Sequence, residues 1–152
     1  MNFRRKTFFI TTLLSAGVCL NAYANPQGEN VVAGNATFDR SSANTLTVNT
    51  SSNKTIINYN SFSIAANEAT VINQPNSGSS TLNRVVGVDP SAIYGTLSSN
   101  GRLFLVNPNG ILFGAGAQVN APSLLASTLN ITDNDFLNGN YNFFKEANKG
   151  SS

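Results

Sequence analysis

The chain has 152 residues, with nine Lys or Arg and seven Asp or Glu, and its formal net charge is +2. Three of the positive charges lie in residues 4–6, so the 128 residues after position 24 carry a net charge of −1, which excludes a basic patch for nucleic acid or anionic lipid. The chain has no histidine and one cysteine, Cys19. A histidine base, a thiol nucleophile and disulfide bonds are therefore excluded for the part after residue 24.

Residues 1–24 have the pattern of a signal peptide. A basic start precedes an apolar run over residues 8–20, and small residues, Ala22 and Ala24, occupy the two positions that a signal peptidase reads. We predict cleavage before Asn25 and export across the inner membrane. The apolar run is shorter than the ~20 residues that a membrane-spanning helix needs, so a stable membrane anchor is the less favoured interpretation.

After the leader, the dominant pattern is an alternation of apolar and polar residues with a period of two, which indicates β-strands. Leu46 and Val48 alternate with threonine and asparagine, and Phe62 and Ile64 alternate with serine. No segment has the sustained apolar spacing of an amphipathic helix. We therefore predict an all-β chain with short strands at residues 45–48, 55–59, 62–65, 70–73, 82–86, 103–106, 111–113, 117–120 and 124–131.

Two architectures fit this pattern, a β-sandwich and a β-solenoid. Asn-Gly pairs at residues 100–101 and 109–110 would serve as hairpin turns in a sandwich. Most predicted strands are very short, however, and the Asn-, Gly- and Ser-rich spacers have no hairpin rhythm. This favours a parallel β-helix with coils of roughly 20–25 residues. Stacked asparagine side chains would then form hydrogen-bonded ladders along its corners.

Residues 107–111, Asn-Pro-Asn-Gly-Ile, carry the sharpest turn signal in the chain. One apolar run, residues 103–106, enters this pentapeptide, and a second, residues 111–113, leaves it. Asn at the first position, Pro at the second and Gly at the fourth suit a type I turn, because Pro presets φ and Gly relieves the exit. The segment is either a structural corner whose isoleucine fills the core or a segment that a partner recognises, and the two interpretations overlap.

Residues 101–111, Gly-Arg-Leu-Phe-Leu-Val-Asn-Pro-Asn-Gly-Ile, resemble the hallmark of the two-partner secretion domain. That domain lies at the N-terminus of filamentous haemagglutinin, of high-molecular-weight adhesins and of contact-dependent inhibition exoproteins. Further similarities to the family lie in residues 53–64, 82–85, 93–97, 126–131 and 134–136. The resemblance covers most of residues 30–145.

The resemblance implies a right-handed parallel β-helix with short extra-helical strands near the N-terminus. It assigns residues 25–145 to the secretion domain, incomplete at its C-terminus, and residues 146–152 to a polar tail. Many members of the family carry a second motif, Asn-Pro-Asn-Leu. The nearest segment here is residues 73–76, Asn-Gln-Pro-Asn, which is closer to the adhesin-like branch that lacks the motif.

The resemblance also implies a function in secretion rather than catalysis. The expected partner is the outer-membrane transporter of a Gram-negative bacterium, whose POTRA domains bind the chain in the periplasm on its way to the cell surface. No cofactor, metal or catalytic residue is implied. Transporter recognition and nucleation of folding are assigned to Asn107, Pro108, Asn109, Gly110 and Ile111, with Asn83 and Arg84 as secondary candidates.

Two other functions fit the sequence less well. A self-standing surface adhesin would bind host glycan or protein through an exposed aromatic stripe. Tyr141 and residues 143–144 form the one local aromatic cluster, and core packing explains them equally well. A polysaccharide lyase-like β-helix would need converging acids, and the nearest pair, Asp133 and Asp135, lies in a segment that we predict to be a solvated loop.

Overall fold

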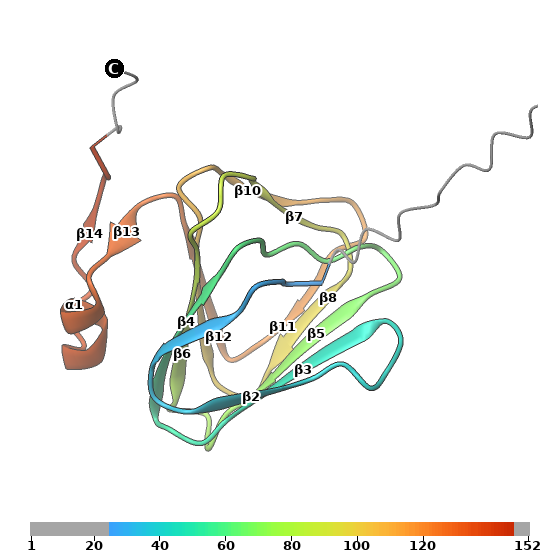
Figure 1. Ribbon diagram of the computed structural model, residues 1–152, viewed down its shortest axis with the longest axis horizontal. Coiled ribbons are helices and arrows are strands. Elements are labelled where there is room, and N and C mark those ends of the chain that lie inside the picture. Colours follow the sequence, from blue (N-terminus) through green and yellow to red (C-terminus); the bar gives the residue numbers. More distant parts are fainter. Residues whose placement is uncertain (1–24, 148–152) are drawn as a thin grey trace, which may run out of the picture.

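A computed structural model describes residues 25–147 and shows them wound into a right-handed β-solenoid of about four turns (Figure 1). The predicted all-β architecture, a parallel β-helix with short extra strands at the N-terminal side, is confirmed. The predicted signal peptide, residues 1–24, lies outside the described residues. Within residues 25–147, no helix has the length and apolar character needed to cross a membrane.

Strands of successive coils stack into sheets that form the sides of the solenoid (Figure 1). The first sheet has the spatial order β1 (Asn30–Ala33), β4 (Lys54–Tyr59), β6 (Ser80–Val85), β9 (Arg102–Val106) and β12 (Ser123–Ser127). The second sheet has the order β11 (Gln118–Asn120), β8 (Thr96–Ser99), β5 (Ala69–Asn73), β3 (Thr45–Thr50) and β2 (Ala36–Asp39). The short third side pairs β7 (Ser91–Ile93) with β10 (Ile111–Phe113).

Parallel pairing sets the length of each coil. In the first sheet, Lys54 pairs with Ser80, Ser80 with Arg102, and Arg102 with Ser123, so successive coils advance by 26, 22 and 21 residues. These lengths agree closely with the coil predicted from the spacing of turns. Each coil connects two parallel strands of the same sheet, and such crossovers are almost always right-handed.

The interior of the solenoid is filled by every second residue of each strand. Leu46, Ile57, Ile72 and Leu105 are 0–1% exposed and belong to one apolar cluster that runs through the coils. The period of two seen in the sequence is therefore the inward face of the strands.

An asparagine ladder links the first two coils, as predicted. Asn49 and Asn73 are in register in the parallel pair of β3 and β5. The Nδ2 of Asn73 donates a 2.9 Å hydrogen bond to the Oδ1 of Asn49. A second, longer bond of 3.4 Å joins Asn76 to Asn53 in the turns that follow these two strands. Stacking of identical amides adds hydrogen bonds in the direction of coil growth.

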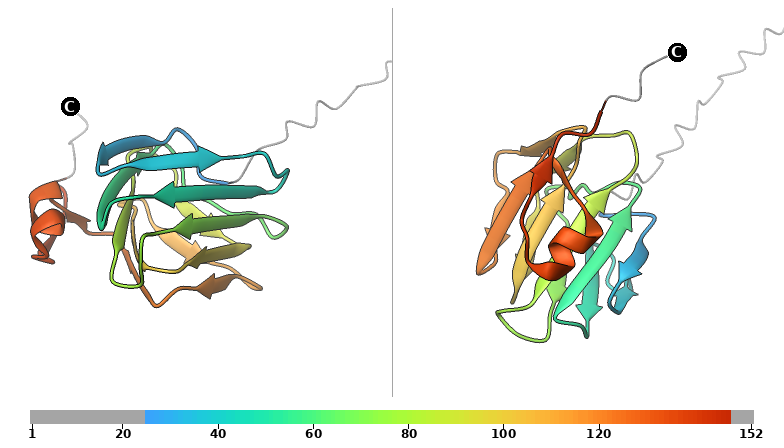
Figure 2. Two further views of the ribbon diagram at one scale, coloured as in Figure 1. Left: turned by 90° about the horizontal axis from the view of Figure 1, so that it is seen from below. Right: turned by 90° about the vertical axis from the view of Figure 1, so that its left-hand side faces the viewer.

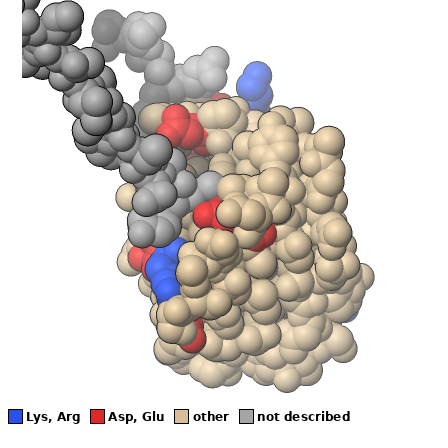
Figure 3. Space-filling model, turned by 90° about the vertical axis from the view of Figure 1, so that its right-hand side faces the viewer, with Lys and Arg blue, Asp and Glu red and all other residues tan. Residues whose placement is uncertain are grey.

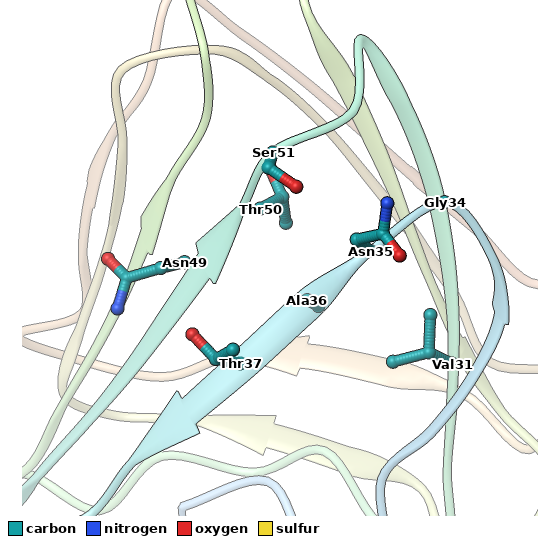
Figure 4. Close-up of a pocket in the computed structure, with 8 residues that line it drawn as sticks. All are labelled: Val31, Gly34, Asn35, Ala36, Thr37, Asn49, Thr50 and Ser51. Carbon is teal, nitrogen blue, oxygen red and sulfur yellow. The ribbon is translucent and has the colours of Figure 1, made fainter.

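Two antiparallel strands cover the first coil. β1 pairs with β4 and β2 pairs with β3, which occupies sheet edges that would otherwise be free to pair with another chain. The turn between β1 and β2 passes close over the backbone at Gly34, which has a φ of 77° (Figure 4). A Cβ on Gly34 would lie 2.7 Å from the carbonyl oxygen of Lys54. Glycine is therefore required at this position.

The outer face of the first sheet is also apolar, and residues 130–144, which we name the outer extension, cover it (Figure 2). The outer extension contains β13 (Asn130–Ile131), α1 (Asp133–Asn138) and β14 (Phe143–Phe144). Beneath it, parallel register aligns Ile56, Leu82, Phe104 and Leu125 in one row. Phe136 of α1 is fully buried, and its ring packs edge-to-face on Phe104 with the centroids 5.2 Å apart.

Two cations hold the outer extension at opposite ends of α1. The Nζ of Lys54 donates to the carbonyl oxygens of Phe136 and Leu137 at 3.1 and 3.0 Å. Carbonyl groups in the last turn of a helix have too few backbone donors, and here that of Phe136 accepts otherwise only from the N–H of the capping Gly139 at 3.2 Å. At the start of α1, the Nη1 of Arg84 lies 2.8 Å from the Oδ1 of Asp133. Each cation thus complements the partial charge or the carboxylate at its end of the helix.

Several predicted elements differ from the structure. The strand predicted at residues 62–65 contributes only an isolated bridge at Ile64 and one beside it at Ser61, although Phe62 and Ile64 are buried as the alternation indicated. The strand predicted at residues 124–131 is divided into β12 and β13 because the chain leaves the sheet to start the outer extension. Strands β1, β2, β7, β8 and β14 were absent from the predicted strands.

The loop predicted around Asp133 and Asp135 is wrong, because these residues form the first turn of α1. Thr132 caps the helix by accepting a hydrogen bond from the backbone N–H of Asp135, and Gly139 ends it in the left-handed conformation. Acids in the first turn favour such a short helix through its partial positive charge. Tertiary burial of Phe136 provides the remaining stabilisation.

The outer extension should contribute strongly to stability. We expect Phe136→Ala to lower the free energy of unfolding by about 3 kcal/mol, because it removes a fully buried ring and leaves a cavity against Phe104. The control is Leu137→Ala, at a side chain that is 39% exposed, which should change the free energy by about 0.5 kcal/mol. Urea unfolding followed by circular dichroism measures both, and equal effects would contradict the packing described.

Candidate recognition site at residues 107–111

Residues 107–111 form a tight corner between β9 and β10. The backbone N–H of Gly110 donates to the carbonyl oxygen of Asn107 at 3.1 Å, so the four-residue turn predicted from the sequence is present. Gly110 has a φ of 116°, a conformation that residues with a Cβ rarely adopt. Its carbonyl oxygen accepts from the N–H of Ser91 on β7, which joins the corner to the preceding coil.

The side chain of Asn107 is fully buried and uses its whole hydrogen-bonding capacity. Its Nδ2 donates to the carbonyl oxygen of Asp89 at 3.0 Å and to the Oγ of Ser91 at 2.9 Å. Its Oδ1 accepts from the backbone N–H and the Nδ2 of Asn109. A buried amide satisfied in this way fixes the position of the corner against the coil before it.

The other members of the motif divide between core and surface. Ile111 is half-buried and packs against the interior cluster, as the structural interpretation of the motif required. Pro108 and Asn109 are exposed. Asn109 also donates from Nδ2 to the carbonyl oxygen of Gly87 at 2.8 Å. Only Pro108 and one side of Asn109 are therefore available to a partner that meets the folded domain.

A groove runs beside this corner, with a volume of about 940 Å³ in its larger part. Its lining combines the two exposed motif residues with apolar side chains from the loop before β7 and from the segments around the outer extension, and with the charged Lys145 and Glu146. We name it the corner groove, and its defining residues are Val86, Val88, Pro108, Asn109, Leu129 and Phe144. Val88 is 85% exposed and Val86 is 56% exposed.

Arg84 lies at one end of the corner groove. Its guanidinium group donates to the Oδ1 of Asn58 at 3.2 Å, to the Oδ1 of Asn130 at 3.0 Å and to the carbonyl oxygen of Ile131 at 2.7 Å. With the ion pair to Asp133, these bonds use most of its donors and leave the residue 9% exposed. Arg84 thus positions the outer extension beside the corner.

Asn83, the other secondary candidate, lies inside the solenoid and away from the corner groove. It is 1% exposed and shares the inward face of β6 with Val85. Its Nδ2 donates to the carbonyl oxygen of Phe104 at 3.2 Å, whereas its Oδ1 has no partner among the described residues. The structure therefore brings Arg84, Pro108 and Asn109 together and places Asn83 inside the solenoid.

The aromatic cluster considered for surface binding is largely used in packing. The ring of Tyr141 stacks on Phe104 with the centroids 5.2 Å apart. Phe143 packs against the outer apolar cluster. Tyr141 and Phe144 remain 43% and 42% exposed, and Phe144 lines the corner groove. The cluster therefore packs on the outer face of the first sheet and leaves parts of these two rings exposed.

Charge is sparse in the described part of the chain, and Figure 3 shows a face on which charged side chains are few and separated. Burial raises the pKa of the Tyr59 hydroxyl, which has no hydrogen-bond partner among residues 25–147. Hydrogen bonding from Ser41 lowers the pKa of Asp39. Neither the Tyr59 hydroxyl nor the Asp39 carboxyl group lines the corner groove. No three acidic, histidine or cysteine side chains converge as a metal site in the described residues.

Sequence analysis missed the apolar part of the groove. Val86 falls at the end of a predicted strand, where the alternation gives it no distinct role. Val88 lies between Gly87 and Asp89, in a segment with turn composition. The signal available was an apolar residue placed between two turn residues, which indicates exposure.

A β-solenoid with a covered first coil and a tight corner between stacked coils defines the class of the chain, a β-helical domain whose first coil is capped by antiparallel strands. Comparison with known proteins agrees. The family described as TPS secretion domain matches residues 22–151. The chain therefore belongs to the two-partner secretion domain family, whose members are secreted by Gram-negative bacteria.

Relatives of known structure and name support this assignment. The crystal structure of the HMW1 secretion domain from Haemophilus influenzae matches with a TM-score of 0.78 and 36% identity, over 83% of this chain and 33% of that chain. Two curated relatives are named heme/hemopexin-binding protein. One, from Haemophilus influenzae, is 37% identical over 70% of this chain, and the other, from its strain Rd, is 34% identical over 88%.

The relatives are much longer than the segment that they share with this chain. The matched part covers 12% and 15% of the two heme/hemopexin-binding proteins. The binding of heme or hemopexin in their names is therefore said of those longer proteins and is not assigned to this chain.

The two asparagines of the corner should differ in their contribution to stability. We expect Asn107→Ala to cost about 3 kcal/mol, because it leaves several buried polar groups without partners. We expect Asn109→Ala to cost about 1 kcal/mol, because that side chain is exposed and water can replace it. Urea unfolding measures both free energies, and a larger loss for Asn109→Ala would contradict the assignment of Asn107 as the buried anchor.

Proposed function

We propose that residues 25–145 are the segment by which a long exoprotein is recognised in the periplasm by the POTRA domains of its outer-membrane transporter. The observation that carries the proposal is the corner at residues 107–111. It exposes Pro108 and Asn109 beside a groove lined by apolar and charged side chains, while Asn107 fixes their position from within. A fixed turn next to exposed apolar side chains such as Val88 suits recognition of a protein partner.

We further propose that recognition includes main-chain pairing. β12, β11 and the short β10 each lie at the end of their sheet in the described part of the chain. An unpaired strand edge accepts another strand by β-augmentation, in which main-chain hydrogen bonds give affinity and alternate side chains give selectivity. β12 is preceded in its sheet by β9, which leads directly into the corner. Pairing along β12 and contact with the corner groove are thus compatible.

The same coils would nucleate folding at the cell surface. In a stack of coils, each coil makes contacts mainly with its neighbours, so folding propagates from any coil that is stable. Antiparallel pairing by β1 and β2 gives the first coil partners on its other side.

In this proposal the domain has no catalytic role. Adhesion or binding at a host surface would belong to the rest of the exoprotein.

The test is export with the cognate transporter co-expressed. We expect Asn109→Ala to lower export by about tenfold, the change that follows from losing ~1.4 kcal/mol of binding. The matched control is Ile72→Val, a change in the buried core that costs about 1 kcal/mol without altering the surface. Export is measured as the fraction of chain in the medium. Export of Asn109→Ala at the level of the control, with the domain folded, would contradict recognition at this corner.

A further inference from the structure

The residues that directly follow the predicted cleavage site are built into the first two coils. Asn25 is 6% exposed and Pro26 is buried. The Oδ1 of Asn25 accepts a 3.1 Å hydrogen bond from the hydroxyl of Thr70, which is fully buried on β5. The Nδ2 of Asn25 donates to the carbonyl oxygen of Asn44 at 3.3 Å. The side chain thus joins the start of the described chain to two later segments.

The next residues are fixed by their backbone. Gln27 forms an antiparallel bridge with Ser61, in which the N–H of Gln27 donates to the Ser61 carbonyl at 3.0 Å. The carbonyl oxygen of Gln27 accepts from the N–H of Asn60 at 2.9 Å. The Nη2 of Arg40 donates to the carbonyl oxygen of Pro26 at 2.6 Å. Residues 25–27 are therefore held against the solenoid by one isolated bridge and by side-chain hydrogen bonds.

A signal peptidase hydrolyses the bond between Ala24 and Asn25 by adding water across it, which leaves a carboxylate on Ala24 and an amino group on Asn25. To do so, it must hold residues on both sides of the bond in an exposed, extended form. Consecutive Cα atoms are only ~3.8 Å apart, so a buried Asn25 leaves no free chain on the downstream side of the bond.

We propose that folding of the first two coils closes the cleavage site, so that removal of the signal peptide must precede folding. A precursor that folds first keeps its leader. Cleavage of the folded precursor requires local opening of residues 25–27, and its rate falls with the fraction of molecules that are open. Opening breaks the buried hydrogen bond between Asn25 and Thr70 and the bridge between Gln27 and Ser61. Because both contacts are lost, few molecules are open at any time.

The experiment uses the complete precursor, residues 1–152, with signal peptidase in mild detergent and native buffer. Three forms are compared: the wild type, a variant with eight Gly and Ser residues inserted between Ala24 and Asn25, and Leu46→Asp. The insertion preserves the residues that the peptidase reads and moves the bond away from the fold. Leu46→Asp puts a charge at a fully buried position and prevents folding. Circular dichroism verifies which forms are folded.

We expect the folded wild type to be cleaved at least about tenfold more slowly than Leu46→Asp, and the folded insertion variant to be cleaved within about twofold of Leu46→Asp. Sequencing of the new N-terminus should give Asn25 for the wild type. Equal rates for the wild type and Leu46→Asp would overturn the proposal. So would a resistant insertion variant, because protection would then not depend on the position of the bond, or an N-terminus other than Asn25.

Discussion

In-register parallel stacking of successive coils is the constraint on which the rest of the structure depends. Each strand of an inner coil forms hydrogen bonds with the coil before and the coil after, and the same register aligns like side chains in rows. The asparagine pair Asn49–Asn73 and the outer row from Ile56 to Leu125 both result from it. The corner at residues 107–111 holds this register where the chain turns, because Asn107 bonds to the coil below through Ser91 and Asp89.

This role of Asn107 shows how one short motif serves the structure and how, in the function proposed above, it would serve recognition. A fully buried side chain cannot be read by a partner of the folded domain, so its effect on a partner passes through the position of Pro108 and Asn109. Gly110 allows the exit into β10 at a φ of 116°. The motif therefore holds Pro108 and Asn109 at a fixed place, and the exposed side chains of Val86 and Val88 lie beside them.

The inward half of the fold was predictable from the sequence, because alternation reports directly which residues face the core. The outward half was not. The run of apolar residues at 103–106 predicts a strand, yet only the outer extension explains why Phe104 and Val106 are buried as well as Leu103 and Leu105. Thr132 and Gly139 carry ordinary helix-capping signals, but a helix of six residues gives too little periodicity to detect. The corner groove needs the juxtaposition of three distant segments, which no single stretch of sequence encodes.

The outer extension changes how the solenoid behaves as a folding unit. In a plain stack, stability is close to a sum of coil and neighbour terms, and the end coils open first. Here Lys54 of β4, Arg84 of β6 and Phe104 of β9 all contact the one extension, with bonds that span 82 and 83 residues from Lys54 to α1. Three successive coils are thereby coupled, so none opens without loss of contacts shared with the others. Under the proposed function, in which this domain starts the folding of an exoprotein, such coupling is an advantage, because a cooperative unit presents either all of its surfaces or none.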